Sequence, residues 1–177
     1  MLRKILSYGV VAGLVVGVSL SAVVVMAGRH QDNGMAIGYL IMLVGLSVVF
    51  VGIKRYRDQD LGGVIRFWPA FGLGLGISAV AGVLYVISWE ATVAITHMDF
   101  ANVYANMLIE QERAKGVSAE DLARFTAEME AFKVQYADPL FRLPMTFIEI
   151  FPVGVLVSLV SAGLLRSSRF LPARAVA

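Results

Sequence analysis

The stretch FWPAFGLGLGISAVAGVLYVISW, residues 67–89, contains 23 residues and no charged side chain. A helix needs about 20 mostly apolar residues to cross the hydrocarbon core of a bilayer. Trp68 and Trp89 are 21 residues apart, which is about 31 Å along a helix. Tryptophan favours the two membrane interfaces. The stretch therefore predicts a membrane-spanning helix with Trp68 at its inner boundary and Trp89 at its outer one.

Three further stretches have the length and composition of membrane spans. Residues 5–27 and 35–53 carry no charge, and residues 143–165 carry only Glu149. A basic start could also mark a signal peptide, but the first apolar run exceeds the usual core of about 7–15 residues. We therefore expect four spans, at about 5–27, 35–53, 68–89 and 143–165, with the third reaching 96 if its helix continues.

The composition agrees with a membrane protein. Of 177 residues, 58% are hydrophobic and 16% are charged, whereas a soluble domain is about 45–50% apolar and about 25% charged. The net charge of +2 is too small to indicate nucleic-acid binding, and the absence of cysteine excludes disulfides and thiolate chemistry. The expected class is an all-α integral membrane protein whose first partner is the lipid bilayer.

Basic residues predict the orientation. One side of the expected bundle would carry nine of them: Arg3, Lys4, Lys54, Arg55, Arg57, Arg66, Arg166, Arg169 and Arg174. The other side would carry Arg29 and the long segment 96–142, which holds five basic and eight acidic residues. Because basic loops stay in the cytoplasm, we expect both termini inside and the long segment outside.

The long segment has helical periodicity and is expected to form an antiparallel helical hairpin over about 97–138. Ser118 is placed to cap the second helix, after a stop at Lys115-Gly116. Apolar residues then recur three and four apart, a spacing typical of helix packing: Leu122, Phe125, Met129, Phe132 and Tyr136. The hairpin is either a spacer that packs on itself or a surface whose apolar edge meets the membrane, a second copy or a partner. In the second case Leu122, Phe125, Met129 and Phe132 are the contact candidates.

The junction between the third span and the hairpin has two interpretations. No glycine or proline lies between Gly82 and Gly116, which favours one continuous helix, and this is the interpretation we prefer. The alternative is a break near Thr96, with Asp99 capping a new helix.

Small residues recur at four-residue spacing in two spans. Gly9, Gly13 and Gly17 form two overlapping G-x-x-x-G repeats, and Gly72 and Gly76 form another pair. Such spacing lets helix backbones approach closely in lipid. It predicts either packing inside the protein's own bundle, which we favour, or a homo-oligomer interface.

Ionisable side chains inside a membrane are costly and mark candidate sites. Glu149 lies within the fourth span, three residues before Pro152, and Glu90 follows the third. Arg142 precedes Glu149 by seven residues and is placed to pair with it. Alternatively, the two carboxylates share a proton, with His97 or Arg142 nearby. The plainer interpretations are an interfacial Glu90 and a structural Glu149.

The remaining patterns are weaker. Lys54, Arg55 and Arg57 are candidates for binding anionic lipid at the inner face, although a simple topology determinant is favoured. No P-loop, G-x-S-x-G or H-E-x-x-H pattern occurs. His30 and His97 lack metal-ligand spacing. We therefore expect no cofactor, no metal site and no enzymatic activity.

Three segments carry a resemblance to a known family: GIKRYRD (52–58), MEAFKVQYADPL (129–140) and FIEIFPVGVLVSLVSA (147–162). Together they resemble the bacterial four-span membrane family catalogued as domain of unknown function 4199, over about residues 8–165. The resemblance implies a bacterial cytoplasmic membrane protein of this plan and implies no activity. Glu149 and Pro152 match the family pattern, whereas Asp138 departs from it, because an amide often stands there.

Two classes of function follow. The first is a non-enzymatic scaffold, accessory or assembly subunit whose external hairpin contacts a partner protein. The alternative is a small oligomeric transporter or channel that uses Glu149 and Glu90 as a proton or cation site. The regular hairpin and the single clearly intramembrane charge favour the first.

Overall fold

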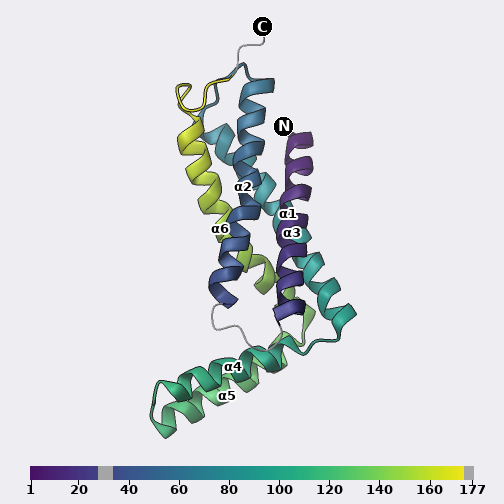
Figure 1. The fold of residues 1–177 in the computed structure, drawn as a ribbon, viewed down its shortest axis with the longest axis vertical. Coiled ribbons are helices and arrows are strands. Elements are labelled where there is room, and N and C mark those ends of the chain that lie inside the picture. Colours follow the sequence, from purple (N-terminus) through teal and green to yellow (C-terminus); the bar gives the residue numbers. More distant parts are fainter. Residues whose placement is uncertain (28–33, 174–177) are drawn as a thin grey trace. The chain divides into compact units, whose positions relative to one another are not determined.

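The computed structural model describes residues 1–27 and 34–173, and the side chains of residues 1–25 and 36–173. All regular structure in these residues is helical (Figure 1). The helices are α1 (Leu2–Ala27), α2 (Gly34–Asp60), α3 (Phe67–Thr96), α4 (Phe100–Ala114), α5 (Ala119–Tyr136) and α6 (Pro139–Leu165). The expected all-α fold is confirmed. Arg29, His30 and Arg174, which entered the predictions above, lie outside the described residues.

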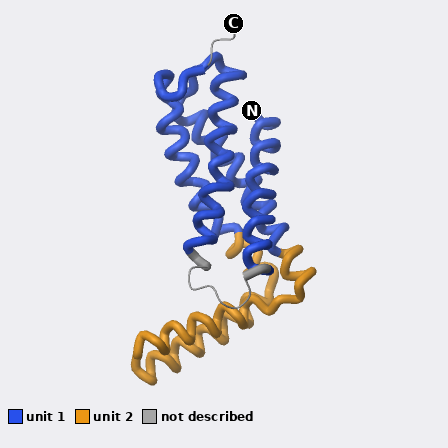
Figure 2. The backbone as a smooth tube through the Cα atoms, in the orientation of Figure 1, with its two compact units in different colours: residues 1–89, 147–177 blue, residues 90–146 orange. Residues whose placement is uncertain are grey.

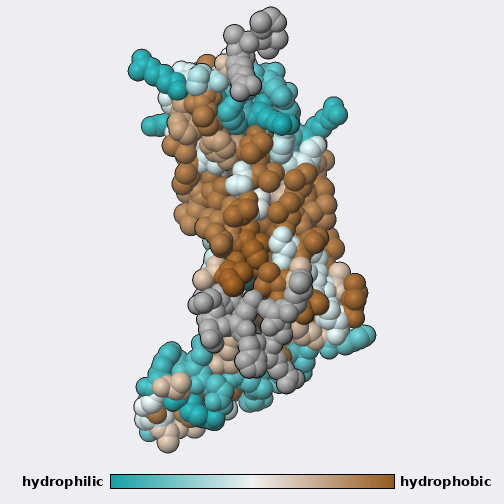
Figure 3. Space-filling view, viewed as in Figure 1, coloured by the Kyte–Doolittle hydropathy of each residue, from teal (hydrophilic) through white to brown (hydrophobic). Residues whose placement is uncertain are grey.

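Four helices are long and apolar enough to cross a membrane: Leu2–Val25, Ala36–Asp60, Phe67–Thr96 and Pro139–Leu165. The four expected spans are confirmed, and apolar side chains, brown in Figure 3, cover the visible sides of these helices. Each helix extends beyond its charge-free stretch at one end or both. The chain is therefore a multi-pass helical membrane protein.

The two tryptophans of α3 have different environments. Trp68 is 75% exposed, as expected for a ring at the membrane interface. Trp89 is only 6% exposed, so its ring packs inside the protein, and α3 continues past it to Thr96. Trp89 is therefore a poor marker of the outer boundary.

The chain divides into two compact units (Figure 2). The first comprises Met1–Trp89 and Phe147–Ala177, and the second comprises Glu90–Thr146. The first unit thus holds α1, α2, most of α3 and most of α6. The second holds the end of α3, the helices α4 and α5, and the start of α6.

The glycine repeat of α1 brings this helix close to α3 in the first unit. A Cβ atom on Gly13 would lie 2.7 Å from the Cβ of Leu84 and 3.0 Å from the Cα of Ala81, which is tighter than any normal contact. Gly9 and Gly17, one turn to either side, approach α3 equally closely. In this chain the repeat therefore serves packing inside the bundle, the interpretation favoured from the sequence.

The glycine pair of α3 is not a comparable interface. A Cβ on Gly76 would lie 2.8 Å from the side chain of Ile5 in α1, whereas a Cβ on Gly72 would meet nothing within 4 Å. Of this pair, only Gly76 contributes to packing between the described helices.

Serines join α3 to α6 in the first unit. A Cβ on Gly154 would lie 2.6 Å from the Cβ of Ser78. The hydroxyl of Ser78 donates to the carbonyl of Gly154 at 3.3 Å, and the hydroxyl of Ser158 donates to the same carbonyl at 2.7 Å. Small side chains thus permit the close approach, and the hydroxyls of these buried serines have partners inside the bundle.

The continuous helix that we preferred from the sequence is wrong. α3 ends at Thr96, and His97 adopts a positive φ of 51° that interrupts the helix. Asp99 then caps α4, because its carboxylate accepts a hydrogen bond from the backbone N–H of Asn102 at 3.2 Å. A good N-cap residue therefore decides the boundary where no glycine or proline is present.

The second unit contains the expected helical hairpin, formed by α4 and α5. Ala101, Ala105 and Ile109 are the buried residues of α4, and their spacing of four places them on one helix face. Gly116, with a φ of +72°, makes the turn, and Ser118 caps α5 by accepting from the backbone N–H of Asp121. The hairpin is confirmed, including its predicted cap.

Candidate functional site

Arg142 and Glu90 form a bidentate ion pair in the second unit. Nε of Arg142 donates to Oε1 of Glu90 at 2.7 Å, and Nη2 donates to Oε2 at 2.6 Å. Nη1 of Arg142 also donates to the backbone carbonyl of Tyr136 at 3.2 Å. The pair is largely enclosed, with side-chain exposures of 15% for Arg142 and 30% for Glu90. Two parallel hydrogen bonds of this kind compensate the charge of Glu90 and fix its orientation.

An aromatic cluster in the second unit contacts this pair through Tyr136. The guanidinium of Arg142 lies 5.7 Å from the ring centre of Tyr136, which is 7% exposed. Tyr136 contacts Phe100 and Phe132, with ring centres 5.6 and 5.4 Å apart respectively. Phe132 in turn contacts Tyr104 at 6.1 Å. These rings form the apolar core of the hairpin at its base.

Glu149, within α6, has a different partner from the one predicted. Its Oε2 accepts a hydrogen bond from the hydroxyl of Tyr85 at 3.1 Å, and Tyr85 is 5% exposed. The residue Glu149 itself is exposed. Pro152 is also exposed and has no N–H to donate to the carbonyl of Ile148, four residues before it. A carboxyl group and a backbone carbonyl therefore lie along one stretch of α6, and the hydroxyl of Tyr85 on α3 binds the carboxyl group.

The predicted constellation is thus assembled in part. The sequence predicts Arg142 beside Glu149, or a proton shared by Glu90 and Glu149, whereas both oxygens of Glu90 accept from Arg142. His97 lies exposed at the break between α3 and α4. Helical spacing does not reveal which residues on other helices these side chains contact. Tyr85 was not predicted, since a tyrosine in an apolar span has no distinctive pattern.

The four predicted partner-contact residues lie on the side of α5 that faces α4. They are half-buried: Leu122, Phe125, Met129 and Phe132. The outward side of α4 instead exposes Val103 and Met107, at 41% and 40%. Each of these two lies two positions from a buried residue of α4, which is about 200° around a helix. The exposed apolar surface of the hairpin therefore includes this neighbouring pair on α4, together with Val134 on α5, which is 76% exposed.

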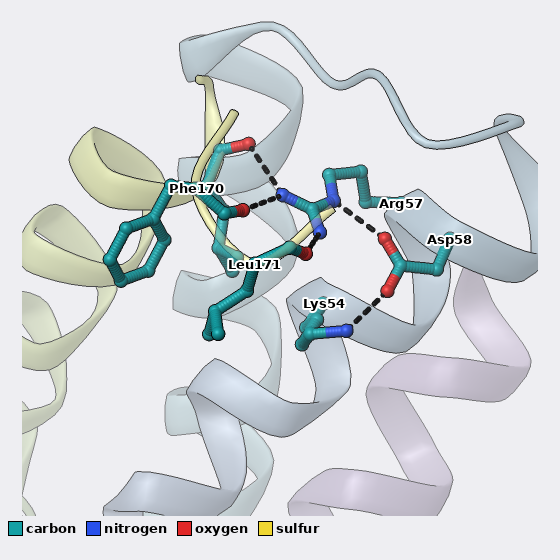
Figure 4. A network of polar contacts seen from close by, with 6 residues as sticks. Lys54, Arg57, Asp58, Phe170 and Leu171 are labelled. Atoms are coloured by element: carbon teal, nitrogen blue, oxygen red, sulfur yellow. Dashed lines mark hydrogen bonds and ion pairs between the residues drawn. The ribbon is translucent and has the colours of Figure 1, made fainter. Parts of the chain in front are cut away.

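Arg57, a lipid-binding candidate from the sequence, has a buried role in the first unit that the sequence does not predict (Figure 4). It is fully buried, and its guanidinium donates to the backbone carbonyls of Leu165, Phe170 and Leu171, at 3.4, 2.9 and 2.5 Å. Its Nε donates to Oδ1 of Asp58 at 2.7 Å. Arg57 therefore holds the C-terminal turn against the end of α2. It is not available to a lipid headgroup, although the sequence made it a candidate for lipid binding.

The other two candidates for lipid binding differ from each other. Lys54 donates to Oδ2 of Asp58 at 2.5 Å, so this acid is shared by Lys54 and Arg57 (Figure 4). Arg55 is exposed, and its one polar contact among the described residues is a weak hydrogen bond to the hydroxyl of Tyr8 at 3.5 Å. Of the three, only Arg55 is free to meet a headgroup.

Within residues 1–27 and 34–173, no three His, Asp or Glu side chains gather in a way that would hold a metal ion. Two of the predicted acids are instead held by one partner each, Glu90 by Arg142 and Glu149 by Tyr85.

Comparison with known proteins identifies a family for this chain but no similar curated protein or solved structure. No curated protein and no solved structure matches the chain significantly. The model of one family, described as "Protein of unknown function (DUF4199)", matches residues 7–167. That match covers most of the first span, the other three spans and the hairpin, so the chain belongs to the DUF4199 family of proteins of unknown function.

Proposed function

We propose that this protein is a non-enzymatic scaffold, accessory or assembly subunit whose hairpin contacts a partner protein. The observation that carries the proposal is the exposed pair Val103 and Met107 on the outward side of α4. The other exposed positions of α4 are mainly polar or alanine, and an apolar strip of this kind on a polar helix is typical of an interaction surface.

The construction of the hairpin supports this role. Both helices have side-chain caps, from Asp99 and Ser118. Charged side chains pair along the surface at spacing i, i+3: Glu110 with Arg113, Glu112 with Lys115, Asp121 with Arg124, and Glu130 with Lys133. The Arg142–Glu90 ion pair joins the end of α3 to the start of α6, the two segments that flank the hairpin in the second unit. A preorganised helical surface loses little conformational entropy on binding, which favours recognition.

The chain offers a clean test because it contains no cysteine. Val103→Cys and Met107→Cys are each coupled to a thiol-reactive photo-crosslinker in native membranes. The matched control is Ala127→Cys, at an exposed position of α5. We expect one adduct of defined mass from positions 103 and 107 and none from position 127. The adduct's mass distinguishes a second copy from another protein. Absence of any adduct, or equal yield at all three positions, would contradict the proposal.

The orientation belongs to the same proposal. The hairpin would lie outside the cytoplasm, with both termini inside, in a bacterial cytoplasmic membrane. This rests on the basic residues around the ends of α1, α2 and α6, and on the excess of acids in the long segment. With a membrane-impermeant maleimide, Ala127→Cys is expected to react in intact cells and Ser167→Cys only after permeabilisation. The reverse pattern would invert the orientation.

A second candidate function, a small oligomeric transporter or channel, is favoured by Glu149. A carboxyl group in a membrane span is costly unless it serves a purpose, and the one described partner of Glu149 is Tyr85. Glu90 contributes less to this function than predicted, because Arg142 already compensates it. Proton flux into liposomes that contain the protein tests this candidate. Glu149→Gln should abolish such flux and Arg113→Gln should not, whereas a wild-type protein without flux would eliminate it.

A further inference from the structure

Five exposed arginines lie at one end of the first unit. They come from four places in the chain, at the start of α1, the end of α2, the start of α3 and the end of α6: Arg3, Arg55, Arg66, Arg166 and Arg169. These ends are neighbours in the structure. Lys4 lies 3.3 Å from Asp60, and Arg57 contacts the carbonyl of Leu165. Hydrophilic side chains, teal in Figure 3, gather at this end beyond the apolar sides of the helices. We call these five residues the arginine rim.

The acids at this end are already paired with other residues. Asp58 binds Lys54 at 2.5 Å and Arg57 at 2.7 Å, and Asp60 binds Lys4. Among the described side chains, no ion pair connects the arginine rim to an acid. The charge of the rim is therefore available to an external anion.

Part of the rim is held on a fixed turn. Arg166 and Arg169 follow α6, in the segment whose carbonyls at Phe170 and Leu171 are bound by the buried Arg57. The ring of Phe170 also packs edge-on against Phe50, with ring centres 6.4 Å apart. A rigid backbone at this place lowers the entropy cost of holding a ligand between two long side chains.

Apolar side chains lie directly beneath the rim on the same helix faces. Leu6, three residues after Arg3, is 49% exposed, and Val51, four residues before Arg55, is 42% exposed. Residues three or four apart are neighbours on one face. Trp68, two residues after Arg66, is 75% exposed, as is typical of the headgroup level. The same ligand would therefore meet cations above and apolar surface below.

We propose that the arginine rim binds the phosphate headgroups of anionic phospholipids while their acyl chains lie along the exposed apolar faces of α1 and α2. Guanidinium groups form paired hydrogen bonds with phosphate oxygens. The apolar surface beneath favours a lipid over a free phosphate. The lipid site is thus formed by Arg55 and four arginines distant in sequence, and Lys54 and Arg57 have a structural role.

The test uses the full chain in detergent and counts retained lipid by native mass spectrometry. The probe is phosphatidylglycerol, with phosphatidylcholine as the neutral comparison. The variant is Arg166→Gln with Arg169→Gln. Its control, Arg113→Gln with Arg124→Gln, removes the same charge from the hairpin. We expect wild type and control to retain phosphatidylglycerol preferentially. The rim variant should bind it about fivefold more weakly for each arginine removed, which corresponds to about 1 kcal/mol each.

Two further arms complete the experiment. Circular dichroism checks that the variant is folded. If the variant is not folded, the proposal is tested on the wild-type protein alone. Its preference for phosphatidylglycerol must then weaken as the salt concentration rises. Inorganic phosphate at millimolar concentration should leave the retained lipid unchanged. Equal lipid retention by the rim variant and the control, a salt-independent preference, or displacement by inorganic phosphate would each overturn the proposal.

Discussion

The guanidinium of Arg142 holds both carboxylate oxygens of Glu90, a residue 52 positions earlier in the chain, at 2.6–2.7 Å. Within the second unit this contact joins the start of α6 to the end of α3, on either side of the hairpin. The ends of the hairpin are therefore fixed by a charge-assisted pair with defined geometry, and the aromatic ring of Tyr136 covers the guanidinium.

The geometry of this pair predicts that Arg142→Lys destabilises the protein although charge is conserved. Lysine provides a single point charge and cannot reproduce the two parallel hydrogen bonds. We expect the free energy of unfolding to fall by about 1–3 kcal/mol, measured as a lower thermal midpoint in detergent. Arg113→Lys is the control, since Arg113 and Glu110 are 59% and 65% exposed. Equal midpoints for the two variants would show that the bidentate contact contributes nothing.

The close approach of α1 to α3 makes a second prediction. Gly13→Ala should destabilise the bundle by about 1–3 kcal/mol, because the added Cβ would lie 3.0 Å from the Cα of Ala81. The backbone of Ala81 cannot shift to make room for this Cβ as easily as the end of a flexible side chain could. Gly72→Ala, where nothing lies within 4 Å, should be neutral or slightly stabilising. Thermal unfolding of both variants checks the difference. A larger loss from Gly72→Ala would indicate that an unseen surface packs there.

Much of this fold follows from local sequence features. Apolar length predicted the four spans, and Ser118 with its neighbours predicted the start of α5. Two boundaries differ from the sequence prediction: Trp89 does not mark the outer end of α3, and the helix breaks after Thr96. There the absence of glycine and proline was given more weight than the capping ability of Asp99, and the cap determines the structure.

The candidate sites were less predictable, because they depend on which helices meet. Polar positions in and near the spans can be found by inspection, and Glu90, Arg142 and Glu149 were found in this way. Their partners cannot be found by inspection of the sequence, since the Arg142–Glu90 pair connects helices at opposite ends of a long insertion. Arg57 illustrates the same limit, because its ligands are mostly backbone carbonyls, which any sequence could supply.

Burial of Arg57 predicts a local effect at the C-terminal turn. Arg57→Met leaves three backbone carbonyls without their donor and removes a partner of Asp58. Removing one member of such a buried network costs about 3–5 kcal/mol. We expect trypsin to cleave after Arg166 and Arg169 at least about tenfold faster than in wild type, since about 1.4 kcal/mol already corresponds to a factor of ten.

Arg55→Met is the matched control for that experiment, because Arg55 is exposed on the same helix. It should leave the cleavage rate within about twofold of wild type, as expected for a surface substitution. If Arg57→Met does not accelerate cleavage, the turn is held by other contacts, such as the packing of Phe170 on Phe50.

The cap of α4 predicts a dependence on pH outside the spans. The side chain and the backbone N–H of Asn102 both donate to the carboxylate of Asp99, and these hydrogen bonds lower its pKa below the usual value. A group whose pKa is lower in the folded state stabilises that state at pH values above the unfolded pKa. The contribution is lost as pH falls through the lowered pKa. Hydrogen exchange at residues 100–103 should therefore accelerate on acidification.

Asp99→Asn separates the titration of this carboxylate from its capping role. Asparagine also accepts a hydrogen bond at an N-cap but does not ionise, so exchange at residues 100–103 should lose its acid-induced increase and remain slow relative to Asp99→Ala. Because the exchange rate itself varies with pH, each rate is compared with that of the unstructured peptide. If wild type and Asp99→Asn show the same protection between neutral and acidic pH, titration of Asp99 does not control the start of α4. The capping hydrogen bond alone would then account for the boundary between α3 and α4.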